Sequence, residues 1–220
     1  MFKTYFSTPI SIKENFLQPD IHKNLLQLIN NLKKDSLAAA RSWHSPMNLL
    51  HEKSDCIEYF EKTMIENFKE FHLMWLKQNE QDQYQLEMQD RPEDIDYLEE
   101  QLTYSVFSWA FASKADSFCE PHVHPFAILT AVYYLQMPTG LKSPEGCIEF
   151  LNPMPGATQS RPISNFEKLL IKPKENSLLI FPAYMHHWAH PFRNNNQERI
   201  IIGTDYCTNL PSYAKNVKSY

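Results

Sequence analysis

Apolar positions in the first eighty residues recur with a helical period in two places. In residues 20–34 they lie three or four positions apart, at Ile21, Leu25, Leu28, Ile29 and Leu32. Asp20 is of the residue type that caps helix N-termini, and Lys33 and Lys34 suit the negative end of a helix dipole. A longer aromatic stripe predicts a second helix over residues 54–78, with its apolar face packed on a sheet. Residues 41–50 are expected to form a loop, and the Gln- and Glu-rich residues 79–100 a solvated linker or lid.

From about residue 101 the pattern changes to short runs rich in β-branched and aromatic residues. Clusters of Pro, Gly and Asn separate these runs, which predict strands at residues 102–111, 127–137, 147–151, 169–171, 177–181 and 199–206. Many short strands with frequent turns favour a β-sandwich or jelly roll. We therefore expect a helical N-terminal extension over residues 1–100, packed on a β core formed by residues 101–220.

Composition narrows the class of protein. A chain of 220 residues is long enough for one domain with an appendage. The net charge of −5, without a dense Lys/Arg block, gives no reason to expect a nucleic-acid partner. The four cysteines have no CxxC spacing, so free thiols in a reducing compartment are expected. Because no long uncharged apolar stretch occurs, we expect a soluble, cytoplasmic protein without a membrane partner.

Five of the nine histidines fall in two short clusters. His122 and His124 are two positions apart, and on a strand they would point to the same face. The second cluster, which contains His186, His187 and His190, follows a strand. One metal ion gripped by His122, His124 and a histidine from the distant cluster is typical of a non-haem iron site in a β-barrel. We expect His186 and His190 to be bystanders or hydrogen-bond partners of a ligand.

Two further residues stand out in the predicted strands. Tyr134 shares a strand face with Ile128, Thr130 and Val132, and this face could continue the one that His122 and His124 begin. Arg199 opens an apolar strand, where a buried guanidinium is costly unless it meets an anion. Trp109 and Trp188 are expected to be core residues.

Four motifs in order resemble the 2-oxoglutarate- and iron(II)-dependent oxygenases, and most closely a bacterial and phage group related to the prolyl hydroxylases. They are the run HVHPFAILTAVYYL at residues 122–135, GCIEF at 146–150, KPKENSLLIFP at 172–182, and then His187, Pro191 and Arg199. The resemblance covers residues 101–206, about half of the chain.

The resemblance implies a mainly β fold with helices, a double-stranded β-helix (jelly roll, cupin-like) with the N-terminal helices packed outside. It implies Fe(II) bound by His122, His124 and His187, and 2-oxoglutarate whose distal carboxylate meets Arg199 and Tyr134. It also implies an O2-dependent dioxygenase of the hydroxylase type, which would release succinate and CO2 while acting on an unidentified organic or peptidyl substrate.

One position departs from the family pattern. His124 lies where these enzymes carry a carboxylate ligand, which changes the charge of the site and its preference among metals such as iron, zinc and nickel. Glu120 is an alternative source of the carboxylate. Two rival interpretations stay open: a three-histidine cupin-like dioxygenase that uses no keto acid, and a non-catalytic metal- or ligand-binding jelly roll. The sequence does not fix the oligomeric state, and a homodimer is compatible with it.

Overall fold

The computed structural model of the chain describes residues 8–34, 42–87, 104–153, 168–193, 196–208 and 218–219. These residues form two α-helices, one short 3-10 helix and ten strands. In chain order the elements are β1 (Ser11–Glu14), α1 (Pro19–Lys34), β2 (Ser42–His44), η1 (Leu49–His51), α2 (Asp55–Glu87), β3 (Tyr104–Ser113), β4 (Leu129–Gln136), β5 (Ile148–Leu151), β6 (Lys168–Ile171), β7 (Ser177–Pro182), β8 (His187–Ala189), β9 (Arg199–Thr208) and β10 (Lys218–Ser219).

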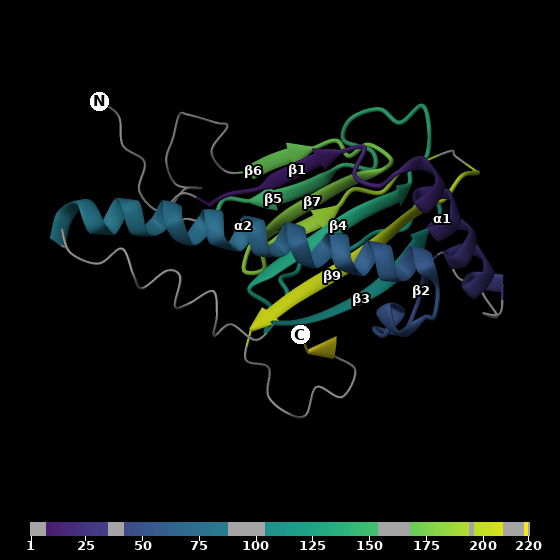
Figure 1. Cartoon of the computed structure of the whole chain (residues 1–220). Coiled ribbons are helices and arrows are strands. Elements are labelled where there is room, and N and C mark those ends of the chain that lie inside the picture. The colour runs from purple at the N-terminus through teal and green to yellow at the C-terminus, as the bar shows by residue number, and fades with distance from the viewer. Residues whose placement is uncertain are drawn as a thin grey trace.

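The strands form two antiparallel sheets (Figure 1). The major sheet has the order β1-β7-β4-β9-β3-β10, with β2 also paired to β3. The minor sheet has the order β6-β5-β8. The predicted jelly-roll fold with helices outside it is confirmed, because α1 and α2 cover one face of the major sheet.

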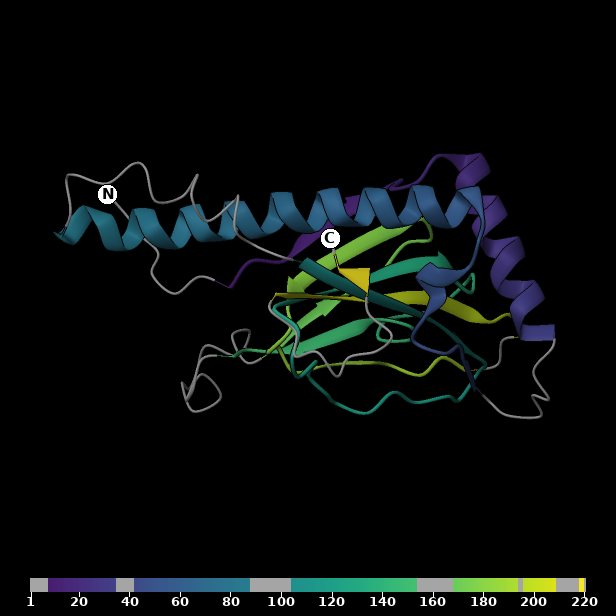
Figure 2. The same cartoon turned by 60° about the horizontal axis from the view of Figure 1, so that its bottom comes forward.

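Alternation along the strands gives the major sheet two different faces. Tyr133 of β4 and Ile202 of β9 belong to the cluster that packs beneath the helices, together with Phe60 and Phe68 of α2. Their neighbours in sequence, such as Tyr134, point to the opposite side, toward the minor sheet. Figure 2 shows the resulting layers, with α2 along the outer side of the major sheet. The inner face is therefore free to build a site between the sheets.

The predicted helices exist, but their ends differ from expectation. Asp20 is not an N-cap, because α1 begins at Pro19, and the first turn bonds from the His22 N–H to the Gln18 carbonyl at 2.9 Å. Proline suits this place since it has no N–H to leave unsatisfied. The second helix runs to Glu87 instead of residue 78. The Gln and Glu residues taken as a sign of a linker are good helix formers, so the helix continues through them.

The N-terminal region also contributes strands that the pattern did not predict. β1 pairs with β7, and β2, which lies in the expected loop 41–50, pairs with β3. Strands of four and three residues contain too few alternating positions for a sequence pattern to identify them. The proposed boundary at residue 100 lies outside the described residues, and the division into two regions stays a prediction. Within the described ranges, neither helix is long and apolar enough to cross a bilayer.

Candidate metal centre

A cavity of about 520 Å³ lies between the two sheets. Its walls come from β3, β4 and β9 of the major sheet and from β5 and β8 of the minor sheet. All five residues that the sequence predicted for the site line it: His122, His124, Tyr134, His187 and Arg199. The fold thus brings together groups that are up to 77 positions apart in sequence (199 − 122).

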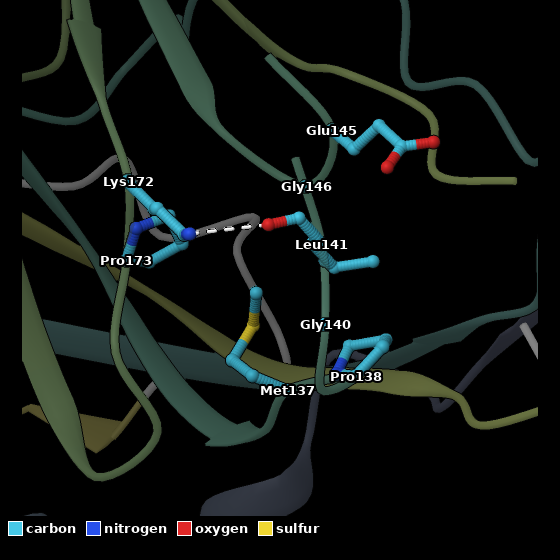
Figure 3. A pocket seen from close by; sticks show the side chains of 8 residues that line it. All are labelled: Met137, Pro138, Gly140, Leu141, Glu145, Gly146, Lys172 and Pro173. Carbon is cyan, nitrogen blue, oxygen red and sulfur yellow. Dashed lines mark hydrogen bonds between the residues drawn. The ribbon is translucent and has the colours of Figure 1, made fainter. Parts of the chain in front are cut away.

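A second cavity of about 160 Å³ lies at the ends of β4 and β6 (Figure 3). Its wall includes Lys172, whose Nζ atom donates a hydrogen bond to the Leu141 carbonyl at 3.2 Å. Glu145 accepts backbone N–H bonds from Lys142 and Arg193. These polar groups are already paired with groups of neighbouring loops, and none of the clustered histidines lines this cavity. The candidate site is the larger cavity.

The three histidines converge on one point. One ring nitrogen from each lies within 4.8 Å of the others, and the centroids of the His122 and His187 rings are 4.4 Å apart. The sequence suggested that His122 lies on a strand, but it is not part of a regular one. It forms an isolated bridge in which it exchanges two backbone hydrogen bonds of 3.0 Å with His187. His124 is fixed by a bond of 3.0 Å from its N–H to the Ala183 carbonyl. Backbone hydrogen bonds thus hold the segment of His122 and His124 beside the segment of His187.

Hydrogen bonds orient all three rings in the same sense. In each ring the Nδ1 atom faces an oxygen: the Glu120 carbonyl at 2.7 Å for His122, the Asp205 carboxylate at 2.8 Å for His124, and the Met185 carbonyl at 2.9 Å for His187. These oxygens only accept, so Nδ1 carries the proton in each neutral ring and the Nε2 lone pair is left. Convergent lone pairs repel one another unless a cation lies between them. The residues present therefore fit a metal ion.

Burial keeps the innermost of these rings neutral. His187 is 4% exposed, and desolvation, helped by the neighbouring His122 and His124, lowers its pKa to about 3. The pKa of His122 is raised, first by its contact with the Cys119 thiol, while burial opposes this shift. A neutral imidazole is the form that binds a metal. His187 is thus ready to act as a ligand across the physiological pH range.

Asp205 is the site residue that sequence reasoning missed. Its carboxylate is buried on β9 and contacts Nδ1 of His124 at 2.8 Å through one oxygen and 3.1 Å through the other. A signal was present, since counting by two from Arg199 reaches Ile201, Gly203 and Asp205 on one strand face. An acidic residue on the buried face of an apolar strand has the same need for a partner as Arg199 has.

Arg199 is deeply buried and lacks an anionic partner within the described residues. It is 3% exposed, its Nε atom donates to Ser113 Oγ at 3.2 Å, and its Nη1 atom donates to the His190 carbonyl at 3.5 Å. Desolvation lowers its pKa. Tyr134 lines the same cavity. Burial raises the pKa of its phenol, and the nearby positive charge of Arg199 partly offsets this shift. A cavity that holds a buried guanidinium beside a phenol fits a carboxylate ligand.

Trp109 was expected to be a core residue, but it has a place in the candidate site. It lines the cavity, and its ring stacks between His44 and His124, with centroid distances of 6.2 and 5.7 Å. The indole lies across Gly203 on the paired strand, where a Cβ atom would come within 2.5 Å of the ring. Only glycine leaves room for this arrangement. Trp188 also lines the cavity and is half-buried.

The remaining candidates lie outside the metal cluster. The Glu120 side chain is exposed, and the residue reaches His122 only through its backbone carbonyl. His186 is exposed. His190 Nε2 contacts the buried Glu149 carboxylate at 2.6 Å. The alternative in which Glu120 completes the metal site gains no support, since the cluster consists of the three histidines.

Comparison with known proteins finds a family model that matches the centre of the chain. Residues 107–205 match a family described as "Putative 2OG-Fe(II) oxygenase". No curated protein sequence matches the chain. The matched stretch contains the three histidines, Tyr134, Arg199 and Asp205. The resemblance inferred from the motifs is confirmed, and Fe(II) and 2-oxoglutarate, which it implied, are the cofactors that the family description names.

Solved structures with a similar fold include two prolyl hydroxylases and a protein that binds nickel and 2-oxoglutarate. A prolyl-4-hydroxylase from Pseudomonas putida has a TM-score of 0.55 at 12% identity, with 91% of this chain and 93% of that chain covered. HygX from Streptomyces hygroscopicus, with nickel and 2-oxoglutarate bound, has a TM-score of 0.56 at 10% identity, with 94% and 84% covered. A prolyl hydroxylase from Trichoplax adhaerens, in complex with a hypoxia-inducible factor peptide fragment, has a TM-score of 0.55 at 14% identity, with 90% and 83% covered. At these identities the likeness establishes the fold alone.

Proposed function

We propose, taking residues 107–205 as a 2OG-Fe(II) oxygenase core, that this chain is a dioxygenase of the hydroxylase type. It would use Fe(II), 2-oxoglutarate and O2, and release succinate and CO2. The observation that carries the proposal is the juxtaposition, in one cavity, of three imidazoles with free Nε2 lone pairs and a buried guanidinium that has no anionic partner among the described residues.

His122, His124 and His187 would hold the metal through Nε2. When bound together with the keto acid, Fe(II) supplies the activation of O2 that this chemistry needs. The protein fixes the direction of each lone pair through the three Nδ1 hydrogen bonds, so the ligands need no reorganisation when the metal enters.

Arg199 and Tyr134 would bind the distal carboxylate of 2-oxoglutarate. A guanidinium and a carboxylate form a charge-assisted pair, which gives the buried Arg199 the counter-charge that the described residues do not provide. The site is otherwise lined by apolar groups such as Val132, Ile148 and Ile201, which exclude water and strengthen this pair.

Asp205 accounts for the departure at position 124. Where the family carries a negatively charged ligand, this chain carries a neutral histidine, and the carboxylate lies one step further out, against Nδ1 of that histidine. Its charge would still favour a cation at the centre and would raise the basicity of His124 as a ligand. We propose that His124 and Asp205 act together in place of the usual carboxylate.

The test is metal binding followed by turnover. We expect wild-type protein to bind Fe(II), or Mn(II) as a redox-quiet substitute, in calorimetry. His187→Ala and His124→Ala should each lose most of that affinity. His186→Ala is the matched control, because this neighbouring histidine is exposed. Fe(II)-dependent succinate release from 2-oxoglutarate should follow the same order.

The outcomes separate the rival functions. Equal metal affinity in His187→Ala and wild type would refute the metal centre. Metal binding without any affinity for 2-oxoglutarate would favour the three-histidine dioxygenase that needs no keto acid. Binding of both without succinate release would favour the non-catalytic jelly roll. The cytoplasmic location and the homodimer stay predictions.

A further inference from the structure

The part of the cavity that is not needed for metal or keto acid is lined mainly by rings. Phe107, Trp109 and Phe111 occupy alternate positions of β3, so all three point into the cavity, and all three are half-buried. With a rise of about 3.4 Å per residue, this row is roughly 14 Å long. The outer face of the same strand carries Val106, Ala110 and Ala112, which are fully packed under the helices.

The charged side chains of the cavity already have partners in the proposed complex. Among the described residues that line it, only Arg199 and Asp205 have charged side chains apart from the histidines. Asp205 is held by His124, and Arg199 would be held by the keto acid. A charged substrate would therefore lose its hydration without gaining a counter-charge, which is costly in an apolar site. The lining selects against charge in whatever enters.

The mouth of the cavity exposes large apolar side chains. Phe126 is 75% exposed and Met47, which follows β2, is 48% exposed. Phe126 also has a φ of 79°, in a region that residues with a bulky side chain rarely adopt. Exposed apolar side chains often mark binding sites, because a ligand that covers them removes apolar surface from water. Strained backbone also occurs often at ligand-binding sites. His44 and Met47 come from the N-terminal region, which thus forms one wall of the site.

We propose, resting on the oxygenase function above, that the substrate is a small uncharged molecule with an apolar ring system. It binds against the row of Phe107, Trp109 and Phe111 and is covered by Phe126 and Met47. The cavity volume of about 520 Å³ lies within the range of small-molecule sites, roughly 300 to 1,000 Å³. The ring is held by burial of apolar surface and by ring contacts, and the reacting C–H bond lies toward the three histidines.

The experiment uses full-length protein loaded with Mn(II) and 2-oxoglutarate, in which no turnover occurs. N-phenyl-1-naphthylamine, an uncharged two-ring probe, reports binding by its increased fluorescence in apolar surroundings. Three competitors share one ring and differ in charge: indole-3-acetamide, indole-3-acetate and tryptamine. We expect the neutral amide to displace the probe at concentrations about tenfold lower than either charged relative.

Variants locate the binding surface. Phe111→Ala and Phe107→Ala should each weaken probe binding by about tenfold, the scale of removing one buried aromatic contact. Phe118→Ala is the matched control, because Phe118 is 56% exposed and does not line the cavity. Affinity for 2-oxoglutarate, measured in the same samples, should be unchanged in all three variants.

Each other outcome overturns the proposal and identifies the cause. Normal binding of metal and keto acid with equal displacement by the three indoles leaves the oxygenase function intact and refutes the substrate class. Equal loss in Phe118→Ala and Phe111→Ala shows adhesion to the surface. Displacement by a proline-containing peptide but by none of the ring compounds shows a peptidyl substrate. Probe binding without any binding of metal or keto acid refutes the oxygenase function, and with it the inference.

Discussion

The two faces of the major sheet are built from alternate residues of the same strands, yet their chemistry is opposite. On the outer face, Tyr133, Ile200 and Ile202 pack under α1 and α2 in an apolar cluster. On the inner face, their sequence neighbours Tyr134 and Arg199 line a cavity together with ionisable groups. The period of two along a strand is what allows this separation.

The difference shows how one sheet can serve stability and chemistry independently. The outer face lowers the free energy of the folded state by removing apolar surface from water. The inner face buries a guanidinium and a carboxylate, each of which costs free energy unless a partner meets it. Substitutions on the outer face should therefore change stability, and those on the inner face should change ligand binding.

The largest effect is expected from Phe68→Ala on the outer side. Phe68 is fully buried on α2, and its ring stacks on Tyr206 with centroids 5.1 Å apart. Removing the ring should lower the free energy of unfolding by about 3 to 5 kcal/mol, since burial is lost and a cavity is left. Urea denaturation measures this. Tyr59→Ala, at an exposed position of the same helix, should have little effect. Loss of metal affinity in folded Phe68→Ala protein would contradict the separation of the faces.

The next largest effect concerns Arg199→Ala on the inner face. We expect affinity for 2-oxoglutarate to fall by about 2 kcal/mol or more, roughly thirtyfold, because a buried charge-assisted hydrogen bond is lost. Stability without ligand should not fall, since the described residues give the guanidinium no counter-charge. Calorimetric titration into Mn(II)-loaded protein measures the affinity, and the exposed Arg193→Ala serves as control. Unchanged affinity in Arg199→Ala would show that 2-oxoglutarate does not bind to Arg199.

A smaller effect is expected from Asp205→Asn, which keeps the shape of the side chain and removes its charge. The amide oxygen can still accept the Nδ1 proton of His124, so the ring keeps its orientation. Metal affinity should fall by about tenfold, the low end of what loss of such a partner costs. Competition against a chelator gives the affinity. If Asp205→Asn binds metal as tightly as wild type, the carboxylate contributes no charge to the site.

The smallest effect concerns His72 on the outer side. Desolvation by burial lowers its pKa from 6.5, and its ring packs edge-on against Tyr206. The unfolded chain therefore binds a proton more readily than the folded one, and stability is lost as the pH falls below 6.5. His72→Phe should make unfolding in urea less sensitive to a change from about pH 7.5 to about pH 5. The exposed His186→Phe is the control. An unchanged pH dependence in His72→Phe would show that this histidine is not the source.

The sequence by itself determined the parts of this protein that local pattern and motif order encode. Runs of β-branched and aromatic residues between turn clusters located β3, β4, β5, β6, β7 and β9, and the period of three to four located both helices. The motif order named His122, His124, His187, Tyr134 and Arg199, and the structure brings all five to one cavity. These features are readable because each depends on residues within a few positions of one another, or on a resemblance that carries the rest.

Tertiary structure alone decided how those pieces meet. The pairing of β3 with β9 puts Trp109 over Gly203, and the pairing of β4 with β9 brings Asp205 to His124, 81 positions away in sequence. β1 and β2 exist because the edges of the major sheet offer them hydrogen bonds, since strands of four and three residues have little stability of their own. Register between distant strands follows from packing of the whole sheet, and no local pattern contains it.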